Sequence, residues 1–143
     1  SIFVEQMKRV FLDTNILLDF GLNRNGAEEA EKILALGLAN VIEVCASYLS
    51  YANMGFILRH HPKDEIYNLI HQMREDVRVL STDATQLDRG LTLFANDFED
   101  ALQYQCAKAN GCDVIITNNS KDYAEFCDLP FMTAAEFLNG LEK

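Results

Sequence analysis

The chain lacks an apolar segment long enough to cross a membrane, for which a helix needs roughly 20 predominantly apolar residues. The longest candidate, residues 33–46, is interrupted by Gly37, Asn40 and Glu43. The amino terminus is short and carries Glu5, so we expect no signal peptide. These absences argue against an integral membrane protein.

The cysteines lack the spacing of a metal site or a disulfide framework. Cys106 and Cys112 are six residues apart, and no histidine stands near either of them. Buried free thiols in a reducing compartment explain this pattern better than zinc or disulfides. We therefore expect a cytoplasmic protein. The thiols concerned are Cys45, Cys106, Cys112 and Cys127.

Basic residues are scarce, with 12 lysines and arginines against 22 acids and a net charge of −10. A surface with this balance does not by itself attract polyanions. A nucleic-acid substrate would need a bound divalent metal, a locally basic groove or a basic partner protein to offset the repulsion.

The length and apolar content fit one domain. A chain of 143 residues with 49% hydrophobic residues can bury a proper core. We expect a single domain over residues 1–143. Met7 directly precedes Lys8 and Arg9, so we interpret residues 1–6 as a processing remnant.

Short apolar runs alternate with segments of helical periodicity. This alternation predicts a parallel sheet of about five strands covered on both faces, an α/β fold with three α/β/α layers. The predicted strands are residues 10–12, 41–46, 77–80, 114–117 and 130–132. The predicted helices are residues 15–20, 26–38, 47–61, 63–74, 83–95, 98–110 and 133–141. Residues 118–122 are expected to form a polar turn, and Leu87, Leu91 and Phe94 are expected to pack inward.

Asp13 stands directly after the first strand. Right-handed crossovers place strands two and three on one side of strand one, and strand four then most simply pairs on its other side. Ligands bind at such a switch point, outside the carboxyl ends of the strands. Asp13 should therefore face the loop after strand four, residues 118–122.

Asp97 and Asp100 are spaced to share one face at the start of a helix, where the helix dipole favours carboxylates. For Asp97, capping the helix and a functional role are equally consistent with the sequence. Asp100 is the stronger candidate because the small, apolar-faced stretch after it should press against the sheet. Carboxylates gathered at one crevice either raise their pKa values or hold a cation. Oxygen ligands without cysteine or histidine suit Mg²⁺ or Mn²⁺, which can assist phosphodiester hydrolysis.

Two basic residues are weaker candidates for RNA contacts. Arg59 belongs to a basic patch over residues 59–63, which is also expected of a helix end on dipole grounds. Lys121 lies inside the predicted polar turn, where a phosphate contact and a solvated side chain are equally plausible.

Four motifs in this order resemble the PIN domain family. They are VFLDTN at residues 10–15, DFEDALQ at 97–103, IITNNSKDY at 115–123 and LPFMTAAEFL at 129–138. Each is weakly specific alone, but together they span nearly the whole chain. The resemblance implies a metal-dependent, Rossmann-like endoribonuclease, most often the VapC-like toxin of a toxin–antitoxin pair and commonly a homodimer. RNA and an antitoxin protein are the implied partners.

The resemblance also implies roles for individual residues. Asp13 matches the first metal-binding acid, Asp100 the acid that opens the later helix, and Asp97 its companion. Asn119 and Asp122 match the positions after strand four, and Thr117 matches the hydroxyl residue that holds the carboxylates. Thr14 and Asn15 follow Asp13 within the first motif and are assigned a supporting role.

Asn53 departs from the family pattern, which has an acid, most often Glu, early in the helix after strand two. A carboxamide offers an oxygen but adds no negative charge. Either the site works with three acids, or its activity is weakened or lost and the protein is a PIN-fold binding or assembly module.

A third interpretation is an aspartate-nucleophile phosphohydrolase, which also begins with a strand ending in Asp. That chemistry needs a second acid two residues later to protonate the leaving group. Asn15 stands there instead, which disfavours this class.

Overall fold

A parallel sheet of five strands forms the centre of the molecule in the computed structural model, which describes residues 7–142. Residues 1–6, interpreted above as a processing remnant, lie outside the described residues. The strand order is β3-β2-β1-β4-β5, so β1 pairs with β2 on one side and β4 on the other, as predicted. The strands are β1 (Lys8–Leu12), β2 (Ile42–Ser47), β3 (Arg78–Leu80), β4 (Val114–Ile116) and β5 (Phe131–Met132).

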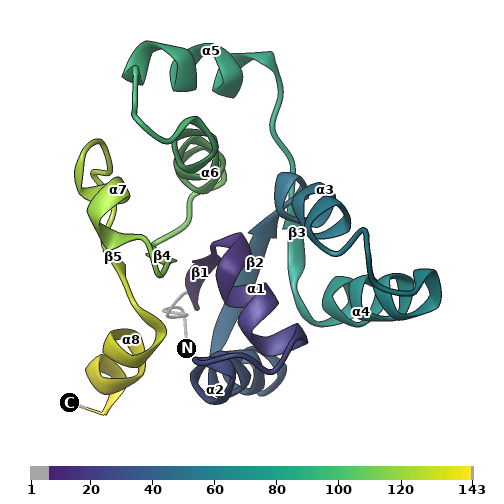
Figure 1. Ribbon diagram of the computed structural model, residues 1–143. Coiled ribbons are helices and arrows are strands. Elements are labelled where there is room, and N and C mark those ends of the chain that lie inside the picture. The colour runs from purple at the N-terminus through teal and green to yellow at the C-terminus, as the bar shows by residue number, and fades with distance from the viewer. Residues whose placement is uncertain (1–6, 143) are drawn as a thin grey trace.

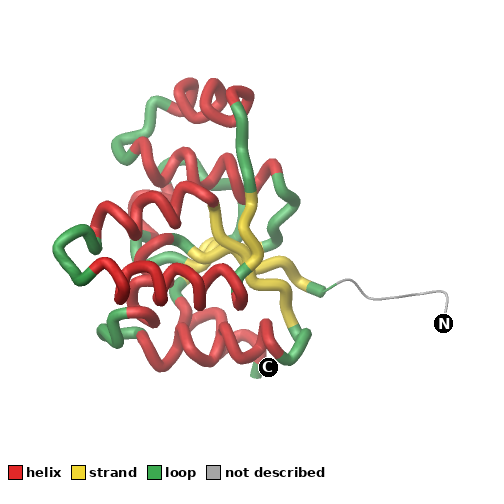
Figure 2. Tube along the Cα trace, turned by 90° about the vertical axis from the view of Figure 1, so that its right-hand side faces the viewer, coloured by secondary structure: helices red, strands yellow, loops and turns green. Residues whose placement is uncertain are grey.

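Helices cover both faces of the sheet, which confirms the predicted three-layer α/β/α fold (Figures 1 and 2). Ser47 caps α3, and capping boxes at Asp83 and Thr133 open α5 and α8. None of the described helices is long and apolar enough to cross a membrane. The helices are α1 (Thr14–Gly21), α2 (Ala27–Leu38), α3 (Tyr48–Ile57), α4 (Lys63–Asp76), α5 (Ala84–Leu93), α6 (Phe98–Ala109), α7 (Ser120–Ala124) and α8 (Ala134–Leu141).

Alternating side chains of β1 divide the core into two parts. Val10 and Leu12 belong to a cluster that includes residues of α1, α2, α4 and α8. Phe11 points to the other face and packs with Tyr104 of α6 and Tyr123 of α7. Because successive residues of a strand face opposite sides, a strand buried on both faces must be apolar throughout, as this one is over residues 10–12.

The register places the ends of β1 and β4 side by side. Leu12 pairs with Ile116, and the next amide, that of Asp13, donates to the Ile116 carbonyl at 3.0 Å. Asp13 and the segment that follows β4 therefore leave the sheet at the same edge. This is the arrangement that the predicted switch point required.

The sequence-based prediction for α5 was wrong. Leu87, Leu91 and Phe94 were expected to pack inward but are 44%, 57% and 94% exposed. The reason is that α5 lies against α6 through its small residue Gly90, where an added Cβ would come 2.8 Å from a methyl of Leu102. The periodicity showed an apolar stripe, but a different face of the helix contacts the protein.

Two boundaries also differ from the predictions. The segment after β4 is a short helix, α7, from residue 120 rather than an irregular turn over residues 118–122. Helix α3 ends at Ile57 rather than near residue 61, and a turn carries the chain to Pro62. The four cysteines are free, as expected, and three of them are buried.

Candidate functional site

Asp13 is held by two hydrogen bonds at the carboxyl end of β1. It caps α1, and its Oδ1 accepts from the Thr14 amide at 2.8 Å. Its Oδ2 accepts from the Thr117 hydroxyl at 2.9 Å. The residue is only 2% exposed. Burial raises the pKa of Asp13, and the bonds from Thr117 and Thr14 oppose this rise because they favour the charged carboxylate.

Asp97 and Asp100 occupy the amino-terminal end of α6. Asp97 is the N-cap, and its Oδ1 accepts from the Asp100 amide at 2.9 Å. Asp100 is 3% exposed, yet its Oδ2 has no hydrogen-bond partner among residues 7–142. Burial raises the pKa of Asp100 to about 8, and the negative charges of Asp13 and Asp97 add to the effect. A buried acceptor without a donor is costly unless something else satisfies it.

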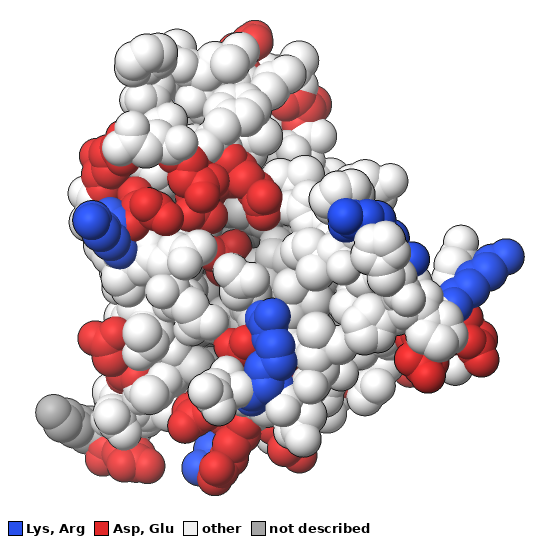
Figure 3. Space-filling view, viewed as in Figure 1, with Lys and Arg blue, Asp and Glu red and all other residues white. Residues whose placement is uncertain are grey.

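The carboxylates from the three predicted segments converge. Oxygens of Asp97, Asp100 and Asp122, the last from α7, lie within 4.8 Å of one another. Asp13 lines a cavity of about 240 Å³ together with Asp97 and Asp100. Figure 3 shows acidic surface gathered where Figure 1 places α6 and α7. The remaining residues that line the cavity are Thr14, Asn15, Ile57, Glu99 and Asn119.

A buried polar network fixes the helices beneath the cavity. The hydroxyls of Thr14 and Ser50 lie 2.8 Å apart, and the Gln103 amide donates to both, at 3.1 and 2.9 Å. The three side chains come from α1, α3 and α6, and all are buried. Sequence reasoning missed Ser50 and Gln103. Their only signal was a polar residue on an otherwise buried helical face.

Thr117 links Asp13 to the segment after β4. Its hydroxyl donates to Asp13 and accepts from the Asn119 amide at 2.9 Å. Asn118 donates to Asp19 at 3.0 Å, and Asp19 is also paired with Arg24 at 2.9 Å. The segment that leads into Asn119 is therefore hydrogen-bonded to Asp13 at the start of α1 and to Asp19 within α1.

Asn53, which occupies the position where the family pattern has an acid, contacts an acid of another helix. Its Nδ2 donates to Oε1 of Glu99 at 2.7 Å, across the space between α3 and α6. Glu99 lines the acidic cavity and is itself exposed; partial burial, followed by the charges of Asp13 and Asp97, raises the pKa of Glu99. Sequence reasoning did not single out Glu99.

The two basic candidates lie outside the cavity lining. Arg59 follows α3, stacks over the Phe56 ring at 4.1 Å and donates to the Phe56 carbonyl. Lys121 is exposed in α7, directly before Asp122. Across residues 7–142, no arginine, lysine or histidine forms an ion pair with Asp13, Asp97, Glu99, Asp100 or Asp122.

The residues of the cavity fit a hard divalent cation. The available side-chain donors are carboxylate, hydroxyl and carboxamide oxygens, which Mg²⁺ and Mn²⁺ prefer. The uncompensated charge has no basic partner within the described chain, and the buried Oδ2 of Asp100 has no donor. A cation would satisfy both the charge and the orphaned oxygen.

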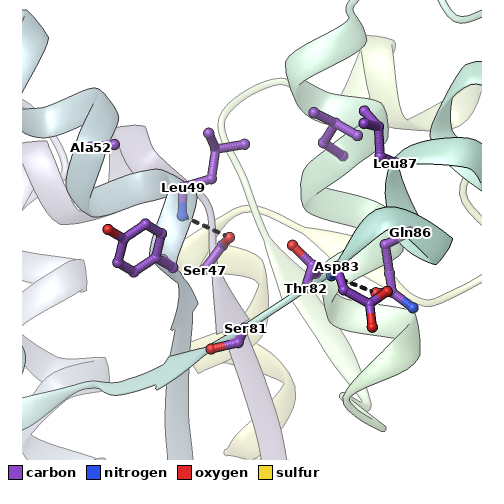
Figure 4. Close-up of a pocket in the computed structure, with 10 residues that line it drawn as sticks. Ser47, Leu49, Ala52, Ser81, Thr82, Asp83, Gln86 and Leu87 are labelled. Atoms are coloured by element: carbon purple, nitrogen blue, oxygen red, sulfur yellow. Dashed lines mark hydrogen bonds between the residues drawn. The ribbon is translucent and has the colours of Figure 1, made fainter.

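A second, larger cavity of about 460 Å³ lies between α3 and α5 (Figure 4). Leu49 and Leu87 approach it from opposite sides. Its only charged lining residue is Asp83, whose carboxylate accepts from the Thr85 amide at the start of α5. This cavity therefore has one carboxylate in its lining, in contrast to the acidic cavity, which is lined by Asp13, Asp97, Glu99 and Asp100.

The fold and the acidic cavity define an α/β protein whose site lies at the carboxyl edge of a parallel sheet. The family model of the PIN domain matches residues 9–121. The chain belongs to the PIN domain family, which confirms the resemblance seen in its motifs. A relative from Aquifex aeolicus (strain VF5), Ribonuclease VapC1, is 24% identical over 136 residues, which cover 91% of this chain and 93% of that protein.

Solved structures share the fold at lower identity. The DNA-bound VapBC of Salmonella typhimurium has a TM-score of 0.72 at 14% identity and covers 90% of this chain and 99% of that chain. VapBC2 of Rickettsia felis, bound to a DNA fragment from its promoter, has a TM-score of 0.71 at 17% identity and covers 86% and 96%. These likenesses support the PIN fold over nearly the whole chain.

Proposed function

We propose that this protein is a metal-dependent endoribonuclease that hydrolyses RNA phosphodiester bonds with Mg²⁺ or Mn²⁺. The observation that carries the proposal is the convergence of Asp97, Asp100 and Asp122, which form no ion pair within residues 7–142. The buried Oδ2 of Asp100, which has no hydrogen-bond partner among the same residues, adds to it. Membership of the PIN domain family and a relative named Ribonuclease VapC1 support the same chemistry.

The proposed cation ligands are Asp13, Asp100, Asn119 and Asp122. When bound, the cation would supply Lewis acidity for the activation of water and would offset negative charge on the phosphodiester. Thr117 and the Thr14 amide hold the Asp13 carboxylate in one orientation. Asp97 uses one oxygen to cap α6, which leaves its second oxygen to accept a proton from the attacking water.

RNA must approach this site against a net charge of −10. We propose that Lys121, beside Asp122, contacts a phosphate at the rim of the site, and that Arg59 beyond the end of α3 contacts another. Phosphate contacts of this kind fix the position of the nucleic acid but do not read its sequence. Replacing either residue by alanine should weaken RNA binding and reduce its salt dependence.

We propose a homodimer and an antitoxin as protein partners. Leu87 and Leu91 are one helical turn apart on α5 and are 44% and 57% exposed. Leu87 lines the cavity between α3 and α5 together with Tyr48, which is 69% exposed. A second copy of the chain would cover this face. Solved structures of similar fold are VapBC complexes, which supports a toxin role with an antitoxin partner. The four free cysteines favour a cytoplasmic location.

Light scattering on a sizing column tests the dimer. The wild-type protein should elute with twice the mass of one chain, and Leu91→Glu should shift it to the monomer mass. A wild-type protein that is already monomeric at micromolar concentration would contradict the dimer proposal. The nuclease proposal does not depend on this result.

The nuclease proposal is tested with a mixed RNA pool and Mn²⁺. Wild-type protein should cleave RNA, and Asp13→Asn should not. Glu31→Gln, which removes one negative charge from an exposed position on α2, serves as the matched control and should cleave like the wild type. Equal cleavage by all three proteins would reject the assignment, because the activity would then come from a contaminant.

A PIN-fold module without nuclease activity is the second candidate, and Asn53 in place of the usual acid favours it. Such a module would not need a cation. Calorimetric titration with Mn²⁺ separates the two: the nuclease should show a site of millimolar affinity or tighter that Asp13→Asn removes, and the module should show none.

A further inference from the structure

Glu99 is an exposed residue that lines the acidic cavity and accepts a hydrogen bond from an amide of another helix. It stands in the first turn of α6 between the cap residue Asp97 and the buried Asp100. The Nδ2 of Asn53, 46 residues away in the chain and on α3, donates to its Oε1 at 2.7 Å. Glu99 lines the same cavity as Asp13.

This orientation is electrostatically unfavourable for a merely structural glutamate. A glutamate in the first turn of a helix gains from the helix dipole without any side-chain partner. A free side chain would turn away from Asp13 and Asp97, because like charges repel. The bond from Asn53 counteracts that repulsion and keeps the carboxylate at the lining of the cavity.

The hydrogen-bond partner of Glu99 is a neutral amide, so the contact is not a salt bridge. An amide N–H orients a carboxylate but does not cancel its charge. The negative charge of Glu99 therefore adds to the charge that Asp13, Asp97 and Asp100 bring to the cavity. The buried Oδ2 of Asp100 has no donor in the described part of the chain, and this independently indicates a ligand at the cavity that Asp100 lines.

We propose that Glu99 is a further carboxylate of the cation site and that Asn53 is its positioning residue. This inference rests on the proposed function, since it adds to the same site. The negative charge that α3 does not supply at residue 53 is provided by α6 through the contact between the two helices. The departure of Asn53 from the family pattern then does not by itself imply an inactive site.

Calorimetric titration of metal-free protein with Mn²⁺ tests the proposal without relying on activity. Glu99→Gln should weaken Mn²⁺ binding by about tenfold to hundredfold, and Asn53→Ala by about tenfold, as for residues that orient metal ligands. Adding Asn53→Ala to Glu99→Gln should cause little further loss, because the amide acts only through the carboxylate. Glu31→Gln is the control for the loss of one charge and should bind like the wild type.

A charge swap gives the sharpest readout. The double variant Glu99→Gln with Asn53→Glu moves the carboxylate from α6 to α3 at the same contact. It should recover most of the Mn²⁺ affinity that Glu99→Gln alone loses. Thermal melts of the metal-free proteins check that each variant is folded. Removing a carboxylate from the cluster should not lower the melting temperature, because it relieves repulsion.

The outcomes separate this inference from the nuclease proposal. If Glu99→Gln binds Mn²⁺ like the wild type while Asp13→Asn loses the site, Glu99 is not part of it and the nuclease proposal stands. If Asp13→Asn also binds like the wild type, both proposals fail. An Asn53→Ala effect that persists in full on the Glu99→Gln background would overturn the positioning role.

Discussion

Glu43 and Asp100 are acids of the same small domain with opposite electrostatic surroundings. Glu43, on β2, accepts from Arg9 at 3.1 Å and from Arg78 at 2.6 Å. Burial alone would raise its pKa, but the two arginines lower the pKa of Glu43 below its ordinary value. Asp100 has no basic partner among the described residues, and burial raises its pKa to about 8.

The difference separates a structural acid from a functional one. Glu43 on β2 forms ion pairs with Arg9 on β1 and Arg78 on β3, so its negative charge is already compensated within the sheet. The carboxylates around Asp100 are left without compensation at the edge where β1 and β4 end. Strongly perturbed acids in a cavity are candidates for function because folding alone would not favour them.

The largest expected contrast is in catalysis. Asp100→Asn should reduce RNA cleavage by about 10²-fold or more, since it removes charge from the reacting site. Glu43→Gln should leave cleavage within a small factor of the wild type. Initial rates on one labelled RNA, measured for both variants, check this, and comparable losses in the two would break the distinction between the acids.

Cation binding should stabilise only the protein with an intact cavity. At a Mn²⁺ concentration of about 100 times Kd, a ligand specific for the folded state adds roughly 2.7 kcal/mol to the free energy of unfolding. Wild type and Glu43→Gln should both show this gain in urea titrations with and without Mn²⁺. Asp100→Asn should lose most of it, and an undiminished gain would place the cation elsewhere.

The two acids should also give pH dependences of opposite sign. The pKa of Asp100 rises from 3.8 unfolded to about 8 folded, so the metal-free folded state holds the extra proton between these values. Its stability should therefore fall as pH rises from about 4 to about 8. Glu43 has a lowered pKa, so its contribution is present above its ordinary pKa of 4.5 and is lost as pH falls below it.

Thermal melts of metal-free protein across this pH range provide the measurement. Asp100→Asn should flatten the decline between about pH 4 and 8, whereas Glu43→Gln should change the curve only on the acid side. An unchanged decline in Asp100→Asn would mean that other groups of the cavity dominate the proton linkage.

The smallest expected effect is the loss of folding stability when the ion pairs of Glu43 are removed. Glu43→Gln removes the charge between two partly exposed arginines, and pairs of this kind contribute about 1 kcal/mol or less. Urea unfolding at neutral pH and low salt measures the difference. High salt should reduce it, because screening weakens exposed charge pairs.

The fold could be predicted because its signals are local and follow one another along the chain. The run of residues 10–12, apolar at every position, indicated a strand buried on both faces, and the crossover rule then placed β4 beside it. The order of the motifs led from there to the convergence of Asp13, Asp97 and Asp100 on one cavity.

What could not be predicted depends on contacts between distant segments. Glu99 is a candidate site residue only because Asn53 of another helix donates to it, and sequence periodicity does not predict that contact. Ser50 and Gln103 likewise take their meaning from a shared network. For α5, the apolar stripe of Leu87 and Leu91 was visible in the sequence, but the pattern cannot say which surface covers it.

Crystals of the protein grown with Mn²⁺ and measured by anomalous diffraction test the central claim most directly. The account predicts an anomalous peak in the acidic cavity, with oxygens of both Asp13 and Asp100 among its ligands, directly or through one water. A fully ordered cavity without a peak at saturating Mn²⁺, or a peak bound only by residues outside it, would contradict the account.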